Sequence, residues 1–368
     1  MSQAVDPSAE LRRSSARRWA AQARLLVVLL LATWLAGWLS ITPARAQQPA
    51  AAAPQADSAS AVPRVDAAAF TVQEFDWLDS ARQRAVPVRL YLPAGVMAGP
   101  SASLSASPRP LPLIVFSHGI GGSRRGYSYL GQFWASQGYA SLHLQHVGSD
   151  RALWSGNLFS VAGRLLAAAQ ESEATARVRD LSFALDQLLA GPLAGQLDAN
   201  RIVAAGHSYG ANTTLLAVGA RVQRDGQPLA LHDRRIKAAI VISAPPFYGE
   251  PSAQRILGAI DVPSLHITAT DDVIRVPGYY SPASDRLAVF DATGGVAKTL
   301  AVFEGGSHSM FTDRAGSGGA LLNAQVKAAT QALSVAFLAS VFDGDASGLR
   351  LWAQRFGGLL AHTSIGLN

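Results

Sequence analysis

The chain of 368 residues contains no cysteine. This absence excludes disulfide bonds, thiolate metal sites and a cysteine nucleophile. Charged residues are also sparse, and much of the net charge of +6 lies in the first 46 residues, whose six arginines and two acids leave about +2 for the remainder. So small a positive charge gives no support to a nucleic-acid-binding surface. The mature part of the chain must be held together by its apolar core, which roughly 300 residues can supply.

Residues 1–46 differ from everything that follows them. Arginines precede an uncharged run from Leu25 to Leu39, and Ala44-Arg45-Ala46 then gives a small-x-small cleavage pattern before Gln47. These features predict a secretory signal peptide, and hence a periplasmic or secreted protein. The apolar run is shorter than the ~20 residues of a usual membrane span, which makes an uncleaved anchor the lesser alternative. Membrane contact is expected only through this leader, if it is not cleaved.

The remainder of the sequence divides into a short neck and one domain. Residues 47–63 are mainly Ala, Pro, Gln and Ser, a composition typical of a disordered linker. From residue 64 to 368, apolar strand patterns alternate with helical patterns and no internal repeat occurs, which predicts an α/β fold with a mostly parallel sheet and helices on both faces. Residues 145–173 fit no regular strand, and we interpret them as a candidate cap over a site. The expected strands are 65–78, 86–92, 113–116, 139–144, 201–205, 236–242, 263–268 and 299–303, and the expected helices are 127–137, 175–189, 211–220, 283–290 and 322–342.

Gly206-His207-Ser208-Tyr209-Gly210 is a G-x-S-x-G pentapeptide between an apolar strand and a helix of small residues. In that context the glycines let strand and helix approach each other closely, so that the serine oxygen stands clear of the backbone in a strained turn. The pentapeptide alone is a common pattern. With its flanking elements it predicts Ser208 as a nucleophile.

A serine hydroxyl needs a base to accept its proton and a carboxylate to orient that base. Asp271 and Asp272 follow one predicted strand, and His308 follows the next. Because the carboxyl ends of parallel strands share one edge of a sheet, these side chains can meet Ser208. We predict His308 as the base and Asp272 or Asp271 as the acid. Asp272 is preferred because of the family resemblance described below, which implies an acid three residues past a small residue such as Ala269.

The turn from Ser117 to Gly122 leaves a buried strand with three glycines. Backbone N–H groups in such a turn can bind a developing oxyanion. We assign the donors to the N–H of Ile120 and the N–H of Tyr209, the residue after the nucleophile. His118 is interpreted as a brace of the turn, with a catalytic role as the alternative. His146 is interpreted as a loop cap, with a place in the lining of the pocket as the alternative.

These motifs resemble the α/β-hydrolase superfamily, and within it the exported bacterial hydrolases described as predicted dienelactone hydrolases or platelet-activating-factor acetylhydrolase-like proteins. The resemblance spans residues 86–310. It implies an eight-stranded core, an ester or thioester substrate, no cofactor and Ser208 as nucleophile. We also predict no metal site. Dienelactone hydrolases have a cysteine at the position of Ser208. In the animal platelet-activating-factor enzymes the acid follows the preceding strand, where this chain has Ser243-Ala244-Pro245-Pro246. The motifs that carry the resemblance are IVFSHGIGG (114–122), GQFWASQGYASLHLQHVGSD (131–150), RDLSFAL (179–185), AGHSYGAN (205–212) and GSH (306–308).

The expected function is therefore that of a serine hydrolase that cleaves small or lipid-like carboxylic esters through an acyl-enzyme. Two alternatives remain open at this point. The same residues serve amide hydrolysis, and a protein of this fold without turnover could act as a binding protein of the cell envelope. The apolar side chains between Trp154 and Leu166 are expected to shape an acyl pocket.

Overall fold

The computed structural model describes residues 65–95, 109–224, 227–247, 252–276, 279–295, 297–314 and 319–365. The predicted signal peptide and linker lie outside these residues. Residues 274–280 group apart from the rest of the described chain, which forms one compact unit. Within the separate segment, β10 (Ile274–Val276) and β11 (Tyr279–Ser281) form a two-stranded sheet, and the guanidinium of Arg275 lies over the ring of Tyr280.

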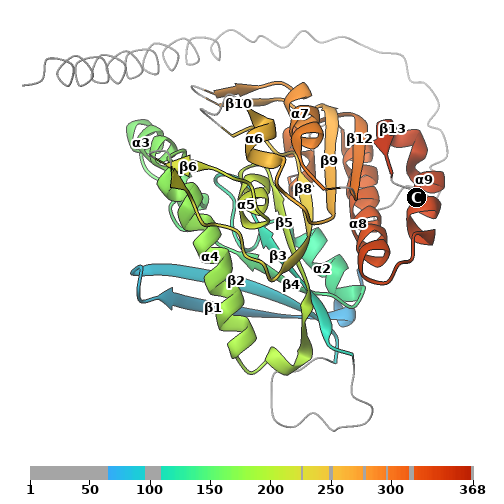
Figure 1. The fold of residues 1–368 in the computed structure, drawn as a ribbon, viewed down its shortest axis with the longest axis horizontal. Coiled ribbons are helices and arrows are strands. Elements are labelled where there is room, and N and C mark those ends of the chain that lie inside the picture. Colours follow the sequence, from blue (N-terminus) through green and yellow to red (C-terminus); the bar gives the residue numbers. More distant parts are fainter. Residues whose placement is uncertain are drawn as a thin grey trace, which may run out of the picture. The chain divides into compact units, whose positions relative to one another are not determined.

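A nine-stranded sheet forms the centre of the main unit (Figure 1). Neighbouring strands from β4 through β3, β5, β8 and β9 to β12 are parallel, while β1, β2 and β13 complete the sheet through antiparallel pairs. This is the mostly parallel α/β architecture predicted from the sequence. The strands, in sheet order, are β1 (Phe70–Asp79), β2 (Arg84–Pro93), β4 (Ala140–Leu144), β3 (Leu111–Ser117), β5 (Leu197–His207), β8 (Ile236–Ile242), β9 (Ser264–Asp271), β12 (Lys298–Ser307) and β13 (Leu360–Ser364).

Helices cover both faces of the sheet, and each face has its own apolar core. One core joins the sheet to α4 (Glu171–Ala190), α5 (Tyr209–Ala217), α6 (Ala253–Leu257) and α7 (Ser284–Ala292). The other joins it to α2 (Ser128–Ser136), α8 (Ala320–Phe342) and α9 (Ser347–Phe356). The central strands are buried on both sides, which explains their continuous apolar sequences.

Helix α8 is long and apolar enough to cross a membrane by length and composition, and it alone passes that test among the described residues. In this structure Val326, Leu333 and Phe337 of α8 are buried in the second core. Packing against the sheet therefore explains its apolar character.

Two differences from the sequence-based expectations concern the edges of the sheet. The first strand begins at Phe70 rather than Val65, because the side chain of Asp66 accepts a hydrogen bond from the N–H of Ala68 and caps a short 3₁₀ turn, η1 (Ala67–Ala69). The sheet has nine strands rather than the implied eight, because β13 pairs with β12. Strand β13 is mostly exposed, so its sequence lacks the apolar alternation that would predict it.

The segment 145–173 is largely helical. It contains the 3₁₀ turn η2 (Arg151–Trp154), helix α3 (Leu158–Ala168) and the first residues of α4. Asn157 caps α3 through a hydrogen bond from the N–H of Ser160. Of the α3 residues, only Ala168 is buried.

Candidate active site

Ser208 lies in the turn between β5 and α5, with φ 56° and ψ −122°. This backbone conformation is strained for a residue with a side chain. The glycines on either side explain how the turn is accommodated. A Cβ on Gly206 would lie 2.2 Å from the carbonyl oxygen of Gly210, and a Cβ on Gly210 would lie 1.8 Å from the carbonyl oxygen of Ser117. Glycine at both positions therefore lets β5, α5 and β3 meet around Ser208.

The structure brings the predicted nucleophile, base and acid together as a hydrogen-bonded chain. The Oγ of Ser208 lies 2.8 Å from Nε2 of His308, and Nδ1 of His308 lies 2.7 Å from Oδ1 of Asp272. A His308 ring with its proton on Nδ1 donates to Asp272 and leaves the Nε2 lone pair for the serine hydroxyl. This arrangement can take a proton from Ser208 as its oxygen attacks an acyl carbon.

The parallel sheet explains why Asp272 and His308 lie close together. Asp272 comes directly after β9, and His308 begins the 3₁₀ turn η4 (His308–Phe311) directly after β12. These strands are neighbours, and Ser307 is aligned with Asp271 in their register. Asp271 itself is exposed, whereas Asp272 is fully buried. The geometry thus distinguishes between the two aspartates that the sequence left open.

Three further side chains surround Asp272. Thr268 donates a hydrogen bond to its Oδ2 over 2.7 Å, Ser243 donates to the same oxygen, and the Nε of Arg286 lies 3.6 Å from Oδ1. Burial would raise the pKa of Asp272, but the hydrogen bond and charge of His308 and the charge of Arg286 outweigh it and hold the pKa well below the usual range. Asp272 is therefore a carboxylate at neutral pH.

The predicted oxyanion turn passes beside the serine. A Cβ on Gly119 would lie 3.2 Å from the Cβ of Ser208. Tyr209 is the first residue of α5, where N–H groups have no partner within the helix. Among the described residues, neither its N–H nor that of Ile120 donates to a protein acceptor. Both predicted donors therefore remain available to a ligand.

Two residues that the sequence analysis did not select connect this turn to His308. The N–H of Gly119 donates to the hydroxyl of Tyr127, which donates to Nδ1 of His207, and Nε2 of His207 donates to the carbonyl of His308. Burial lowers the pKa of His207 to about 3, so its ring is neutral and can have both roles. His207, which precedes Ser208, thus holds the backbone of His308, and the ring of His308 contacts Ser208.

His118 and His146 are both fully buried. Nδ1 of His118 lies 2.7 Å from the carbonyl oxygen of Gly119, and its Nε2 accepts from the N–H of His146, which agrees with the predicted bracing of the turn. The loop-cap interpretation of His146 is wrong, because its ring lies between Ser117 and Asp180, at 3.0 and 3.1 Å. Burial lowers the pKa of both rings well below the usual value.

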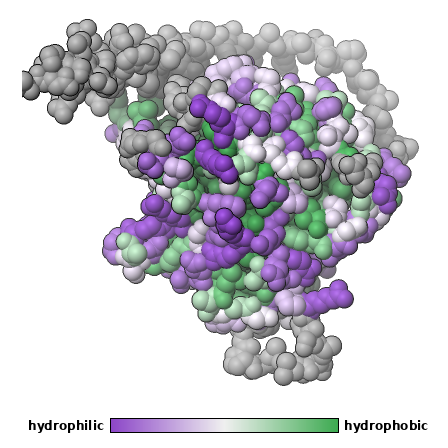
Figure 2. Space-filling model, viewed as in Figure 1, coloured by the Kyte–Doolittle hydropathy of each residue, from purple (hydrophilic) through white to green (hydrophobic). Residues whose placement is uncertain are grey.

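The apolar segment expected to shape an acyl pocket is largely at the surface. Figure 2 shows hydrophobic side chains exposed around α3. Phe159 is 79% exposed and Trp154 is 49% exposed. The indole N–H of Trp154 donates to the carbonyl of Gly121 over 3.2 Å, so this ring lies against the oxyanion turn. Trp154 therefore contacts the predicted oxyanion turn, whereas Phe159 projects into solvent.

No group of three or more histidine, aspartate and glutamate side chains among the described residues is arranged to hold a metal ion.

Comparisons with known proteins agree with this architecture. The sequence profile of a family described as platelet-activating factor acetylhydrolase, isoform II, matches residues 90–158, a stretch that includes the oxyanion turn and ends before Ser208. A comparison with curated protein sequences finds no match. Among solved structures, a ferulic acid esterase from Streptomyces cinnamoneus is similar with a TM-score of 0.57 and 22% identity, over 79% of this chain and 96% of that chain. The chain thus shares the fold of that esterase and is similar over residues 90–158 to the platelet-activating factor acetylhydrolase family.

Proposed function

We propose that this protein is a serine hydrolase that cleaves carboxylic esters through an acyl-enzyme. The observation that carries the proposal is the chain of hydrogen bonds from Ser208 through His308 to the buried Asp272. The similarity to platelet-activating factor acetylhydrolases and to a ferulic acid esterase supports an ester as the substrate.

In the proposed reaction, Ser208 Oγ attacks the ester carbonyl carbon while Nε2 of His308 accepts the hydroxyl proton. The carbonyl oxygen becomes an oxyanion that accepts hydrogen bonds from the N–H groups of Ile120 and Tyr209. The tetrahedral adduct then collapses, and His308 returns the proton to the departing alcohol. Water, deprotonated by His308, hydrolyses the acyl-enzyme in the same way, and Asp272 offsets the imidazolium charge in both halves.

Labelling with a fluorophosphonate tests the nucleophile. We expect the wild-type protein to react covalently and to hydrolyse p-nitrophenyl esters, and Ser208→Ala to lose labelling, with kcat lower by about 10⁴- to 10⁶-fold. Labelling that persists in Ser208→Ala would reject the assignment. A p-nitrophenyl series from acetate to palmitate then defines the acyl preference, and a matched anilide measures any amide hydrolysis.

We also propose that the enzyme acts after export, on the basis of the residue pattern of the leader. Cell fractionation and N-terminal sequencing of the mature protein test this proposal. A first residue at or near Gln47 supports it, whereas an intact N-terminus in the cytoplasm would exclude it.

A further inference from the structure

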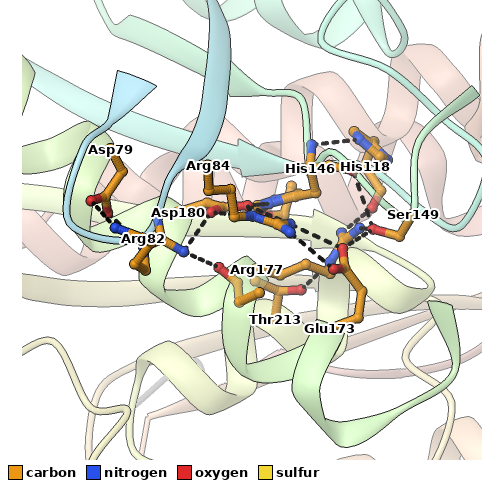
Figure 3. Close-up of polar contacts among 12 residues, drawn as sticks. Asp79, Arg82, Arg84, His118, His146, Ser149, Glu173, Arg177, Asp180 and Thr213 are labelled. Atoms are coloured by element: carbon orange, nitrogen blue, oxygen red, sulfur yellow. Dashed lines mark hydrogen bonds and ion pairs between the residues drawn. The ribbon is translucent and has the colours of Figure 1, made fainter. Parts of the chain in front are cut away.

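A largely buried cluster of charged side chains lies beside His118 of the predicted oxyanion turn (Figure 3). Its acids, Glu173 and Asp180, form ion pairs with Arg84 at the end of the β1–β2 hairpin. Arg177, on the same helix α4 as both acids, is fully buried. Its three hydrogen bonds go to neutral oxygen atoms.

Those three bonds reach three separate segments around the site. The Nε of Arg177 donates to Oγ1 of Thr213 on α5 over 2.9 Å, and Nη1 donates to Oγ of Ser149 over 2.8 Å. Nη2 donates to the carbonyl of His118, in the oxyanion turn. One guanidinium thus connects the helix after the nucleophile, the loop after β4 and the turn after β3 (Figure 3).

The segments that Arg177 connects also contact each other. The N–H of Gly121 donates to the carbonyl of Ser149 over 2.8 Å, and Gly122 forms a parallel bridge with Asp150. The loop after β4 therefore supports the turn from one side. Arg177 fixes both the loop and the turn, because it binds Ser149 and His118 at once.

Arg177 also contacts the second predicted donor. Its guanidinium carbon lies 4.5 Å from the centre of the Tyr209 ring, a cation–π geometry. Thr213, which accepts from Arg177, donates to the carbonyl of Tyr209 over 3.1 Å. The residues that carry the two proposed oxyanion donors therefore lie on segments held by the same guanidinium.

Burial of a charged group costs free energy unless its surroundings compensate it. Burial lowers the pKa of Arg177 to about 10, so the side chain is still protonated at neutral pH. Arg177 hydrogen-bonds only to neutral oxygens, whereas Arg84 pairs directly with two carboxylates, and the charges of Glu173 and Asp180 act on Arg177 without a direct ion pair. A positive charge in a low-dielectric setting stabilises a nearby negative charge.

We infer that Arg177 is the positioning residue of the oxyanion hole: it holds the turn of Ile120 and the first turn of α5 in register, and its charge favours the tetrahedral adduct. This inference rests on the proposed serine hydrolase function. Arg177 is expected to stabilise the transition state and to contribute little to substrate binding. Loss of Arg177 therefore lowers kcat and leaves KM nearly unchanged.

The test compares Arg177→Met with Arg82→Met, a control from the same cluster. Arg82 pairs with Asp79 and Asp180 and does not contact the turn. For Arg177→Met we expect kcat on a p-nitrophenyl ester to fall by about 10- to 100-fold with KM within about twofold, because loss of a full oxyanion donor costs about 10²- to 10³-fold. Affinity for a trifluoromethyl ketone, which forms a tetrahedral adduct with the serine, falls by the same factor. Arg82→Met lowers Tm but keeps kcat within about threefold.

Two further variants separate positioning from stability. Arg177→Lys keeps the charge but cannot reach three oxygens at once, so only partial recovery is expected. Ser149→Ala removes one of the three acceptors, together with the hydrogen bond that Ser149 donates to Glu173, and is the variant to measure if Arg177→Met does not fold. We expect its kcat and ketone affinity to fall together by about 3- to 10-fold.

The outcomes distinguish this inference from the proposed function. A wild-type protein that neither reacts with the fluorophosphonate nor hydrolyses any ester overturns both. If the wild-type protein is labelled and Ser208→Ala is not, the proposed function stands. The inference about Arg177 then fails if Arg177→Met, or Ser149→Ala in its place, retains wild-type kcat and ketone affinity. It also fails if Arg82→Met loses as much kcat as Arg177→Met, or if Arg177→Lys restores kcat in full.

Discussion

The hydroxyl of Ser243 donates a hydrogen bond to the carboxylate of Asp272. Ser243 follows β8 with a φ of 53°, and Asp272 follows β9. The loop after β8 thus supplies a hydroxyl to the carboxylate that follows β9. The ends of the neighbouring strands β8 and β9 thus meet at the side chain of Asp272.

This arrangement predicts a large effect of removing the charge of Asp272. In Asp272→Asn the side chain keeps its size but no longer stabilises the Nδ1–H form of His308, and kcat is expected to fall by about 10⁴-fold. Steady-state kinetics on a p-nitrophenyl ester measure the effect. Asp271→Asn is the matched control, because Asp271 is exposed, and should keep kcat within about twofold. An Asp272→Asn enzyme within tenfold of wild type would contradict the assignment.

The close approach of α5 to β3 makes Gly210 a strict requirement of the fold. Gly210→Ala places a Cβ where the carbonyl of Ser117 already lies, and we expect a loss of at least about 3 kcal/mol in the free energy of unfolding, measured by urea denaturation. Gly163→Ala is the control, since a Cβ there meets nothing within 4 Å on helix α3, and it should stabilise by about 0.5–1 kcal/mol. Equal stability of both variants would show that the helix can move away without cost.

Trp154 is expected to set the preference for bulky acyl groups, because its ring lies against Gly121 in the oxyanion turn. In Trp154→Ala, KM for aromatic or long-chain p-nitrophenyl esters should rise by about 3- to 10-fold, and KM for the acetate should change little. Phe159→Ala removes a more exposed aromatic residue of the same segment and should leave both values unchanged. If the two variants behave alike, Trp154 does not contact the acyl group.

Buried neutral histidines predict a loss of stability in acid. Burial lowers the pKa of His143, His207 and His266 to about 3 in the folded protein, while the unfolded chain titrates near 6.5. The unfolded state therefore binds more protons as pH falls from about 6.5 to about 3, and the stability present at neutral pH is lost across that window.

His266→Phe isolates one of these contributions. His266 packs edge-on against Phe290, and its Nε2 forms a hydrogen bond with the hydroxyl of Ser264 rather than with Ser208, His308 or Asp272. Urea unfolding between pH 4 and 7 should show a slope shallower than wild type by up to about 1.4 kcal/mol per pH unit. An unchanged slope would mean that His266 titrates alike in the folded and unfolded states.

The sequence predicts most of the central sheet and the three hydrogen-bonded residues, for a physical reason. Strands buried on both faces require continuous apolar runs, and parallel strands place their following loops at one edge. Ser208, Asp272 and His308 each follow such a run, so their convergence can be derived without coordinates.

The supporting residues could not be derived in this way. Arg177, Tyr127, Ser243 and Arg286 contact the site through pairings between distant segments, such as the 59 positions from Arg177 to His118. A lone arginine on a helix has no pattern that distinguishes a buried role from a solvated one. The motif RDLSFAL lies next to Arg177 but begins with Arg179, which is exposed, while its Asp180 is buried.

The ion pair between Arg84 and Asp180 also bears on the order of events during folding. The two residues are 96 positions apart. Until α4 packs against the first hairpin, the guanidinium of Arg84 keeps its water shell, and an isolated two-stranded hairpin is only marginally stable. The β1–β2 hairpin is therefore stabilised only when a segment from the middle of the chain reaches it.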